Sequence, residues 1–519
     1  MDDLCDTSQH KPSRSNYVWI RNEPLSSTYE VSKQIGLGSM GEVSIVQKKS
    51  DSGSLRNLSV KDTSLVRTMS GTFSSPPPPP PPTSPTSPPL SPSSPRQYAC
   101  KTVAMLRMSS PQITEFKNEI EILRDLDHPN IVQLYECFIH QHKIYLIMDL
   151  CKGGDIGERV LNEIDTSNVI RQIFEALQYL HLRRVAHRDL KLENVMFVGD
   201  GIKIKLIDFG LSERYVQSSK MKKACGTIYT ASPEVITGQT YTTQTDVWSA
   251  GVCLWCLLVG EVPFLKEMED LQVPEKVEKL KKAQYTFKDP KWTQISSAGR
   301  SLISYCLRAH PGSRYTSKEC LSHINDKWIP SLTSPPPSPS KPKTGRKRIN
   351  SVMLRSFENF SNSGALKKKI LMTMAYTMEK SGLEDLDRTF SDIDVNNEGT
   401  ISVQELRSAI KDKNMKYGDV EVDNLFKGLD YDHSGQIHYK EFLAAAMESQ
   451  NMITAERLLE TFDRMDEDNS GCISRENLRS MLGKDWDESA EEEMFQGKDG
   501  IDFDTFLKVV KGQTEQATK

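Results

Sequence analysis

The chain has 519 residues, a length that suggests about three domains, and its 66 basic and 70 acidic residues give a formal net charge of -4. This near balance favours neither a nucleic acid nor an anionic membrane surface as a partner. Ten cysteines stand without regular spacing, which is typical of free thiols in a reducing compartment. The sequence contains no apolar run of roughly 18 residues or more, so it predicts no membrane span.

Residues 1–27 are predicted to be an N-terminal extension. The opening "MDDLCDTSQH" has no apolar signal stretch, and Asp2 stands where N-myristoylation requires glycine. A cytoplasmic location is therefore expected. The basic "GRKRIN" further along is a candidate nuclear signal, although such a group of cations in a linker is more often solvated charge.

The first candidate site is the glycine-rich stretch "IGLGSMGEV", with Gly36, Gly38 and Gly41. Strand-like runs flank these glycines, which favours a flap over phosphates rather than the strand-to-helix turn of a dinucleotide site. Glycines in such a flap let backbone N–H groups approach phosphate oxygens closely. Taken alone, the stretch fits a simple turn between two strands about equally well.

Charged residues follow in the order that phosphoryl transfer requires. Lys101 lies in the β-rich "YACKTV" and can hold phosphate oxygens, and Glu119 lies on an amphipathic helix and can pair with Lys101. Asp189 and Asn194 in "VAHRDLKLENV", with Asp208 in "IKLIDFGLS", supply the groups that an Mg–nucleotide site and a substrate hydroxyl need. A lone lysine or glutamate would be a solvated surface charge, but the whole series in this order indicates a kinase.

Residues 28–330 resemble the eukaryotic protein kinase catalytic domain, a bilobal α+β fold. The resemblance implies that the glycine flap covers ATP, that Glu119 orients Lys101 on its phosphates, and that Asp189 is the catalytic base. It implies Asn194 and Asp208 as Mg²⁺ ligands. Further residues are implied by the same resemblance: Lys191 for a serine/threonine kinase, Asp246 as a structural anchor, and Ile35, Val43, Ala99, Met148, Asp149 and Asp155 around the nucleotide.

A proline- and serine-rich tract, "SSPPPPPPPTSPTSPPLSPSSPRQ", separates the glycine flap from Lys101. Such a tract is either a linker between domains or an insertion in one of them. Because Lys101 has to reach phosphates under the flap, both segments must belong to one sheet, and residues 49–96 are predicted to be an exposed insertion. Its closure entropy costs only about 0.6 kcal/mol per doubling of length. Its PxxP spacing makes it a candidate for readers of proline-rich motifs.

Two twelve-residue loops, "DVNNEGTISVQE" and "DYDHSGQIHYKE", match the EF-hand calcium loop. Alternate oxygen-bearing residues point at one ion, a glycine makes the sharp turn, and a final glutamate closes the shell with two oxygens. An acidic loop with one glycine is usually just a turn, but the full pattern occurs twice. The predicted ligands are Asp394, Asn396, Glu398, Thr400 and Glu405, then Asp430, Asp432, Ser434, Gln436 and Glu441.

A third loop, "DEDNSGCISREN", keeps Asp466, Asp468, Ser470 and Cys472 at the ligand positions but ends in Asn477. It is expected to bind calcium more weakly. A fourth unit, "FQGKDGIDFDTF", is shortened and has Thr505 where the glutamate belongs, so it is expected to serve as a structural partner of the third hand.

Kinase, linker (331–350) and four hands (381–512) in this order resemble the calcium-dependent protein kinases of plants and protists. Residues 351–380 resemble the autoinhibitory junction helix of that family. In this segment Leu366, Ile370, Met374 and Met378 recur every four residues beside a basic run, which suits an acidic, methionine-rich groove. The alternative is an ordinary core stripe of the calcium-binding domain.

The predicted function is a calcium-activated serine/threonine protein kinase that uses ATP, Mg²⁺ and Ca²⁺ and is blocked by its junction at low calcium. Glu193 resembles a position that favours arginine upstream of the phosphorylated residue, so basophilic protein substrates are expected. Two alternatives remain: a calcium-responsive scaffold with an inactive kinase fold, and a calcium buffer. Lys101, Asp189 and Asp208 argue against the scaffold, and a buffer would not explain the residues before 330.

Overall fold

The computed structural model describes most of the chain, in two units. The described residues are 17–37, 41–49, 96–215, 221, 226–227, 229–263, 273–283, 285–333, 349–378, 383–411, 417–468, 470–482, 495 and 499–511. One unit, the sheet unit, comprises Ile20–Ala104 and Cys137–Leu150, and the other, the helical unit, comprises Met1–Trp19, Met105–Glu136 and Cys151–Lys519. Among the described helices, none is long and apolar enough to cross a membrane. Gly38 and most of the predicted insertion lie outside the described residues.

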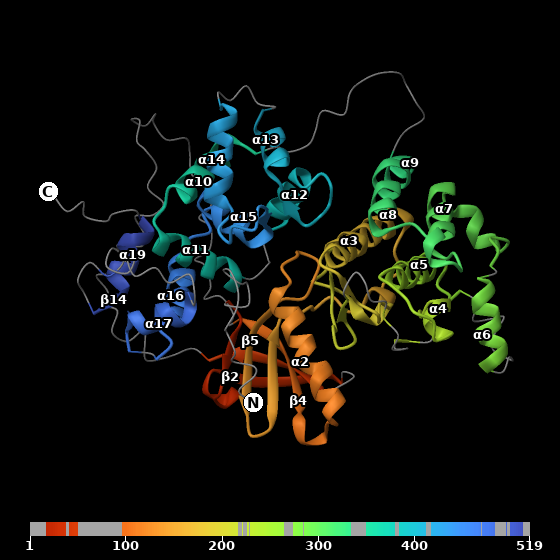
Figure 1. The fold of residues 1–519 in the computed structure, drawn as a ribbon, viewed down its shortest axis with the longest axis horizontal. Coiled ribbons are helices and arrows are strands. Elements are labelled where there is room, and N and C mark those ends of the chain that lie inside the picture. The colour runs from red at the N-terminus through yellow and green to blue at the C-terminus, as the bar shows by residue number, and fades with distance from the viewer. Residues whose placement is uncertain are drawn as a thin grey trace, which may run out of the picture. The chain divides into compact units, whose positions relative to one another are not determined.

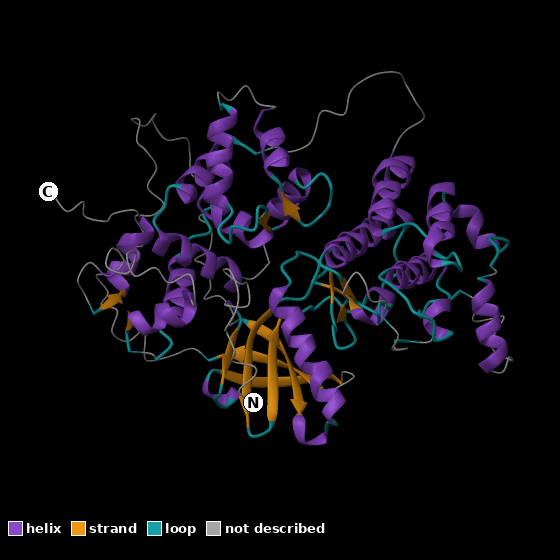
Figure 2. Cartoon of the chain, in the orientation of Figure 1, coloured by secondary structure: helices purple, strands orange, loops and turns teal. Residues whose placement is uncertain are grey.

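The sheet unit is built on an antiparallel arrangement of strands, which Figure 2 shows in orange. The spatial order is β1-β5-β6-β4-β3-β2. The strands are β1 (Trp19–Arg21), β2 (Tyr29–Leu37), β3 (Glu42–Lys48), β4 (Gln97–Ala104), β5 (Leu134–His140) and β6 (Lys143–Met148). Tyr29 packs edge-on against Tyr98 and Phe138, so aromatic residues form part of the core under these strands. The sequence analysis places the start of the kinase domain at residue 28. The sheet starts earlier, at β1.

Strands β3 and β4 are antiparallel neighbours, with Val43 opposite Lys101. The residues between Lys48 and Gln97 therefore leave and re-enter the same sheet, as an insertion in a hairpin does. Gly41 precedes β3 at a point of close backbone approach. A Cβ atom there would come within 2.1 Å of the carbonyl oxygen of Thr102, so only glycine fits.

The first part of the helical unit surrounds two long buried helices. Its helices are α2 (Ser110–Asp125), α3 (Glu163–Leu182), α4 (Pro233–Ile236), α5 (Gln244–Val259), α6 (Val273–Lys282), α7 (Ser297–Cys306), α8 (Ser317–His323) and α9 (Ile329–Thr333). Helix α3 begins where the Asn162 side chain accepts a hydrogen bond from Asp165 N. After its first two turns helix α5 is apolar all round, which is typical of a buried helix. Cys253 lies in this buried helix, where burial raises the pKa of its thiol.

The C-terminal part of the helical unit consists of helix–loop–helix units joined in pairs. Its helices after the junction are α12 (Glu384–Ile393), α13 (Val403–Lys411), α14 (Asp419–Leu429), α15 (Tyr439–Ala446), α16 (Ala455–Met465), α17 (Arg475–Leu482) and α19 (Phe503–Lys511). Short strands link the loops: β11 (Thr400–Ile401) pairs with β12 (Ile437–His438), and β13 (Cys472–Ser474) with β14 (Gly500–Asp502). The predicted fold class, an α+β body followed by an all-α EF-hand body, is confirmed.

The junction differs from the single helix predicted over 351–380. It forms two helices, α10 (Ser351–Ser361) and α11 (Ala365–Thr377). The break falls at Asn362, Ser363 and Gly364, which are poor helix formers, and Asn362 caps α10 while Gly364 precedes α11. Helix α10 packs on α14 and α15, and α11 lies beside α15, α16 and α19 (Figure 1). Leu366, Ile370, Met374 and Met378 are all buried in the core of this part.

Within the helical unit, the first two hands contact the segment after α2 and the residues around α3. The backbone N–H of Lys440 donates to the Asp127 carboxylate at 2.9 Å. Lys203 forms an ion pair with Asp387 of α12. A Cβ atom on Gly399 would come within 2.5 Å of the Tyr179 ring, so the first calcium loop lies directly against α3.

Candidate functional site

The predicted base Asp189 is held by three neighbouring side chains. Its Oδ1 accepts hydrogen bonds from Thr227 N at 3.0 Å and from Thr227 Oγ1 at 2.9 Å. Its Oδ2 accepts one from Asn194 Nδ2 at 3.0 Å and lies 3.1 Å from Lys191 Nζ. Lys191 also donates to Thr227 Oγ1 at 3.1 Å. Three sequence-predicted residues, Asp189, Lys191 and Asn194, therefore form one network around a carboxylate that is fixed in direction.

The loop that carries Asp189 is fastened to α5 through Asp246. The Asp246 carboxylate accepts from the backbone N–H groups of His187 and Arg188 at 3.0 and 2.9 Å, and it lies 3.0 Å from His181 Nε2. Burial alone would raise the pKa of Asp246, but the contact with His181 and the Arg188 N–H outweigh it and lower the pKa. A buried, ionised Asp246 thus anchors the backbone of the catalytic loop.

Asp208 follows β9 (Ile204–Leu206) in a left-handed backbone conformation, with φ 57°. Such a conformation is uncommon for a residue other than glycine and is concentrated at functional sites. The neighbouring Ile207 N donates to Asn194 O at 2.9 Å, which joins this segment to the catalytic loop. Asn194 and Asp208 thus lie on adjoining segments and offer the amide and carboxylate oxygens that suit Mg²⁺.

The remaining predicted nucleotide residues lie on named elements of both units. Lys101 is a buried residue of β4 in the sheet unit, and Glu119 is a buried residue of α2 in the helical unit. On the sheet, Gly36 is opposite Val43, and Ala99 is opposite both Ile45 and Met148. Ile35 lies on β2 and is exposed, and Asp149 directly follows β6. Asp155 caps the short helix Ile156–Glu158 by accepting from Gly157 N at 2.9 Å.

Thr227 is a residue of this network that sequence reasoning missed. It lies 38 residues after Asp189 in the chain, and no helical or strand period connects the two. The signal that could have found it is the preceding Gly226, whose φ is 98°. A Cβ atom at Gly226 would approach the carbonyl oxygen of Arg188 to 2.6 Å, so this glycine brings Thr227 up to the catalytic loop.

The first two calcium loops have the same internal network. In the first, Glu405 accepts from Asn396 N and Ser402 N at 3.2 and 2.9 Å. In the second, Glu441 accepts from Asp432 N and His438 N at 3.0 and 2.7 Å. The closing glutamate therefore ties the third loop position to the ninth with its two oxygens. Both carboxylate oxygens of the glutamate are thereby held beside the other ligand positions of the loop.

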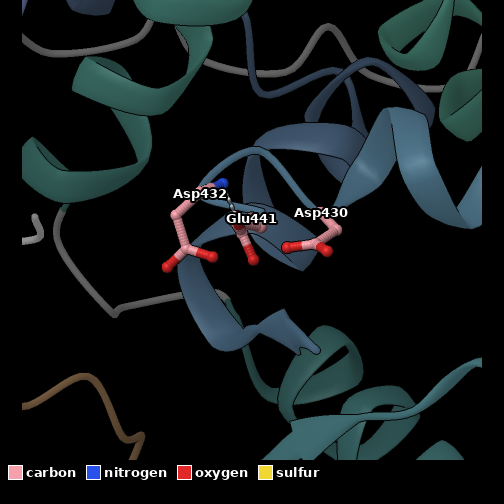
Figure 3. A group of neighbouring side chains, drawn as sticks. All are labelled: Asp430, Asp432 and Glu441. Carbon is pink, nitrogen blue, oxygen red and sulfur yellow. Dashed lines mark hydrogen bonds between the residues drawn. The ribbon is translucent and has the colours of Figure 1, made fainter. Parts of the chain in front are cut away.

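Asp430, Asp432 and Glu441 bring three carboxylates to one place. One oxygen of each lies within 4.8 Å of the others, and Figure 3 shows the three side chains around a common space. Burial raises the pKa of Asp430, and raises that of Asp394 in the first loop well above its ordinary value. Such crowding of buried carboxylates is unfavourable without a cation, so these residues fit Ca²⁺.

The third loop lacks half of the closing contact. Asp466 accepts from Ser470 N and Gly471 N at 3.0 and 2.7 Å, as the first residue of each other loop does from its own glycine turn. Asn477, however, pairs with Ser474, whose N–H donates to Asn477 Oδ1 at 2.8 Å. One amide oxygen thus replaces the two oxygens of Glu405 or Glu441.

Comparisons with known proteins give a family match over each of these two regions of the chain. Residues 91–328 match the protein kinase domain, and residues 383–447 match the EF-hand domain pair. The first range includes Lys101 and the catalytic loop but begins after the glycine flap. The second covers the first two hands. The resemblance inferred from the sequence is confirmed by these matches.

Similar proteins are kinases of several organisms. Calcium-dependent protein kinase 3 of Plasmodium yoelii yoelii is 34% identical over 332 residues, which are 62% of this chain and 58% of that protein. Calcium-dependent protein kinase 15 of Oryza sativa subsp. japonica is 30% identical over 335 residues, 63% of this chain and 59% of that protein. A probable myosin light chain kinase of Dictyostelium discoideum is 34% identical over 252 residues, 46% and 63% of the two chains. The chain therefore spans less than two thirds of the length of these relatives.

Proposed function

We propose that this chain, which contains a protein kinase domain and an EF-hand pair and has calcium-dependent protein kinases as relatives, is a calcium-activated serine/threonine kinase. It would transfer the γ-phosphate of ATP to a Ser or Thr hydroxyl of a protein. Its own EF-hands would control that transfer. ATP would supply the phosphoryl group, and Mg²⁺ would supply positive charge that stabilises this group during its transfer.

The catalytic loop supports the transfer step. Asp189 is held in one direction by Thr227 and Asn194, so its carboxylate can accept the proton of a substrate hydroxyl. Lys191 places a cation beside that carboxylate, where charge develops as the phosphoryl group moves. Asp208 and Asn194 are the side chains that would hold the metal.

The observation that carries the calcium control is the position of the junction. Helices α10 and α11 share one hydrophobic core with the hands, and residues of both helices are buried in it. Ser356 Oγ donates to Ala445 O at 2.6 Å, and Lys440 Nζ donates to Ala375 O at 2.7 Å. A junction packed in this core would have to leave it in order to block the catalytic cleft. We therefore assign this arrangement to the active state and propose that the junction returns to the cleft when the loops are empty.

A preference for basic substrates is part of the proposal. Glu193 lies exposed in the short helix Leu192–Asn194, between Lys191 and Asn194 of the catalytic loop. Its carboxylate is thus available close to the site of transfer, where an arginine upstream of the phosphorylated residue can pair with it. Glu193→Gln is expected to reduce the preference for an arginine-containing peptide over its alanine counterpart.

The deciding experiment is phosphate transfer to a serine peptide by the full chain, in calcium and in chelator. We expect transfer in calcium and little in chelator, with Asp189→Asn inactive in both. Equal transfer in both conditions would contradict calcium control. No transfer in either condition would instead support a scaffold with a kinase fold.

A further inference from the structure

Two residues of the predicted N-terminal extension, Tyr17 and Trp19, are packed against the hands. Tyr17 and Trp19 lie against the hydrophobic core that α10, α11 and the EF-hands share, and Val18 between them is buried. Trp19 is also the first residue of β1. These residues belong to neither the catalytic site nor a calcium loop, so their packing needs its own explanation.

The two aromatic rings cover two buried cations. Lys369 of α11 is 3% exposed, and its ammonium nitrogen lies 4.2 Å from the centroid of the Tyr17 ring. Arg464 of α16 is 5% exposed, and its guanidinium carbon lies 5.2 Å from the centroid of the Trp19 ring. Burial of a cation is unfavourable unless other groups replace the water. Aromatic faces do so, and the interaction is strongest when the cation is desolvated.

Further contacts fix Arg464 and helix α11. Arg464 donates to Tyr135 O at 3.0 Å and lies 3.4 Å from the carboxylate of Glu136, which is itself buried. The Tyr17 ring stacks on that of Tyr376 in α11, with centroids 4.1 Å apart and planes 4° from parallel. Tyr376 O in turn accepts from Gln133 Nε2 at 2.9 Å. Helix α11 is thus held by the segment after α2 and by the N-terminal aromatic residues together.

We infer that Tyr17 and Trp19 form an aromatic clamp. The clamp binds the junction helix α11 when the hands have captured it, together with α16. The clamp requires Lys369 and Tyr376 to lie where they do in this arrangement. If α11 moves to the cleft, as the proposed function requires at low calcium, these contacts are lost. The clamp therefore stabilises only the arrangement with the junction captured, and it shifts the equilibrium toward that arrangement.

The test uses the full chain with Tyr17→Leu, which keeps an apolar side chain but removes the π face. Tyr17→Phe is the matched control, because it keeps the ring and removes only the hydroxyl. The first readout is amide hydrogen exchange of α11 in saturating calcium. The second is the calcium concentration that gives half-maximal phosphorylation of a peptide. For Tyr17→Leu we expect faster exchange in α11 and a roughly three- to tenfold rise in that concentration. Tyr17→Phe should match the parent in both.

A double-mutant cycle with Lys369→Met tests the cation–π pair itself. Lys369→Met keeps the length of the side chain and removes its charge, so after Tyr17→Leu it should cause little further increase in exchange. Additive effects would overturn the pairing. Unchanged α11 exchange in Tyr17→Leu would overturn the clamp, even if the parent is activated by calcium. A parent without calcium activation would contradict the proposed function, while the exchange of α11 would still decide the clamp.

Discussion

At the scale of single residues, Thr227 fixes the position of the Asp189 carboxylate. Thr227→Val keeps the shape of the side chain but removes the hydroxyl that lies between Asp189 and Lys191. Loss of a hydrogen bond to a charged group should lower kcat by about 10- to 100-fold. The KM for ATP should change little, because the side-chain hydrogen bonds of Thr227 are with Asp189 and Lys191 rather than with the residues predicted around the nucleotide. Steady-state kinetics test this, with Thr227→Ser as the control that keeps the hydroxyl and should stay close to the parent.

The closing residue of each calcium loop is a second residue-scale determinant. Glu441→Gln removes the charge from the group that ties Asp432 to His438, and it should raise the half-maximal calcium concentration for activity by roughly tenfold or more. Asn477→Glu adds a second oxygen to the third loop and should strengthen that site. Calorimetric calcium titration of the full chain counts the sites and measures each change. An activation curve unmoved by Glu441→Gln would contradict the role of the second hand.

At the scale of elements, α10 and α14 approach closely at a glycine. A Cβ atom on Gly428 of α14 would lie 1.8 Å from Ser361 Oγ and 2.9 Å from Ser361 Cα. Alanine normally favours a helix over glycine by about 1 kcal/mol. Here the clash should outweigh that gain and cost about 1–3 kcal/mol of packing. Gly428→Ala should therefore speed amide exchange in α10 and raise the calcium needed for activity.

Gly364→Ala is the matched control for the element scale. Gly364 precedes α11, has an ordinary negative φ, and a Cβ atom there meets no atom within 4 Å. This variant should leave the exchange of α10 unchanged. Equal exchange in Gly428→Ala and the parent would show that α10 does not rest on α14 in solution.

At the scale of the whole molecule, the first hand is joined to the kinase domain by a charged pair. Lys203 pairs with Asp387, and their side chains are 22% and 15% exposed. Lys203→Glu should raise the half-maximal calcium concentration by about two- to fivefold. The double variant Lys203→Glu/Asp387→Lys restores opposite charges and should recover most of the loss. Peptide phosphorylation at low and high salt measures both, and the effect should shrink at high salt. A swap that recovers nothing would argue against this contact.

The sequence by itself determined the features whose cause is local. The calcium ligands alternate along one short loop, so Asp430, Asp432 and Glu441 could be placed together from their spacing. The order of Lys101, Asp189 and Asp208 along the chain indicated phosphoryl transfer. The pairing of β3 with β4 across the proline-rich insertion could also be predicted from the sequence, because Lys101 has to lie beside the glycine flap.

The tertiary structure alone decided those contacts between distant residues that no motif requires. Thr227 reaches Asp189 only because Gly226 allows a close backbone approach, and Tyr17 reaches Lys369 only because α11 packs in the core of the hands. The break of the junction at Asn362–Gly364 likewise lets α10 pack on α14 and α11 pack on α16 and α19, while both helices contact α15. Local preferences act over one or two turns of chain. Contacts at long separation depend on how the whole chain buries its apolar surface, which no short stretch of sequence specifies.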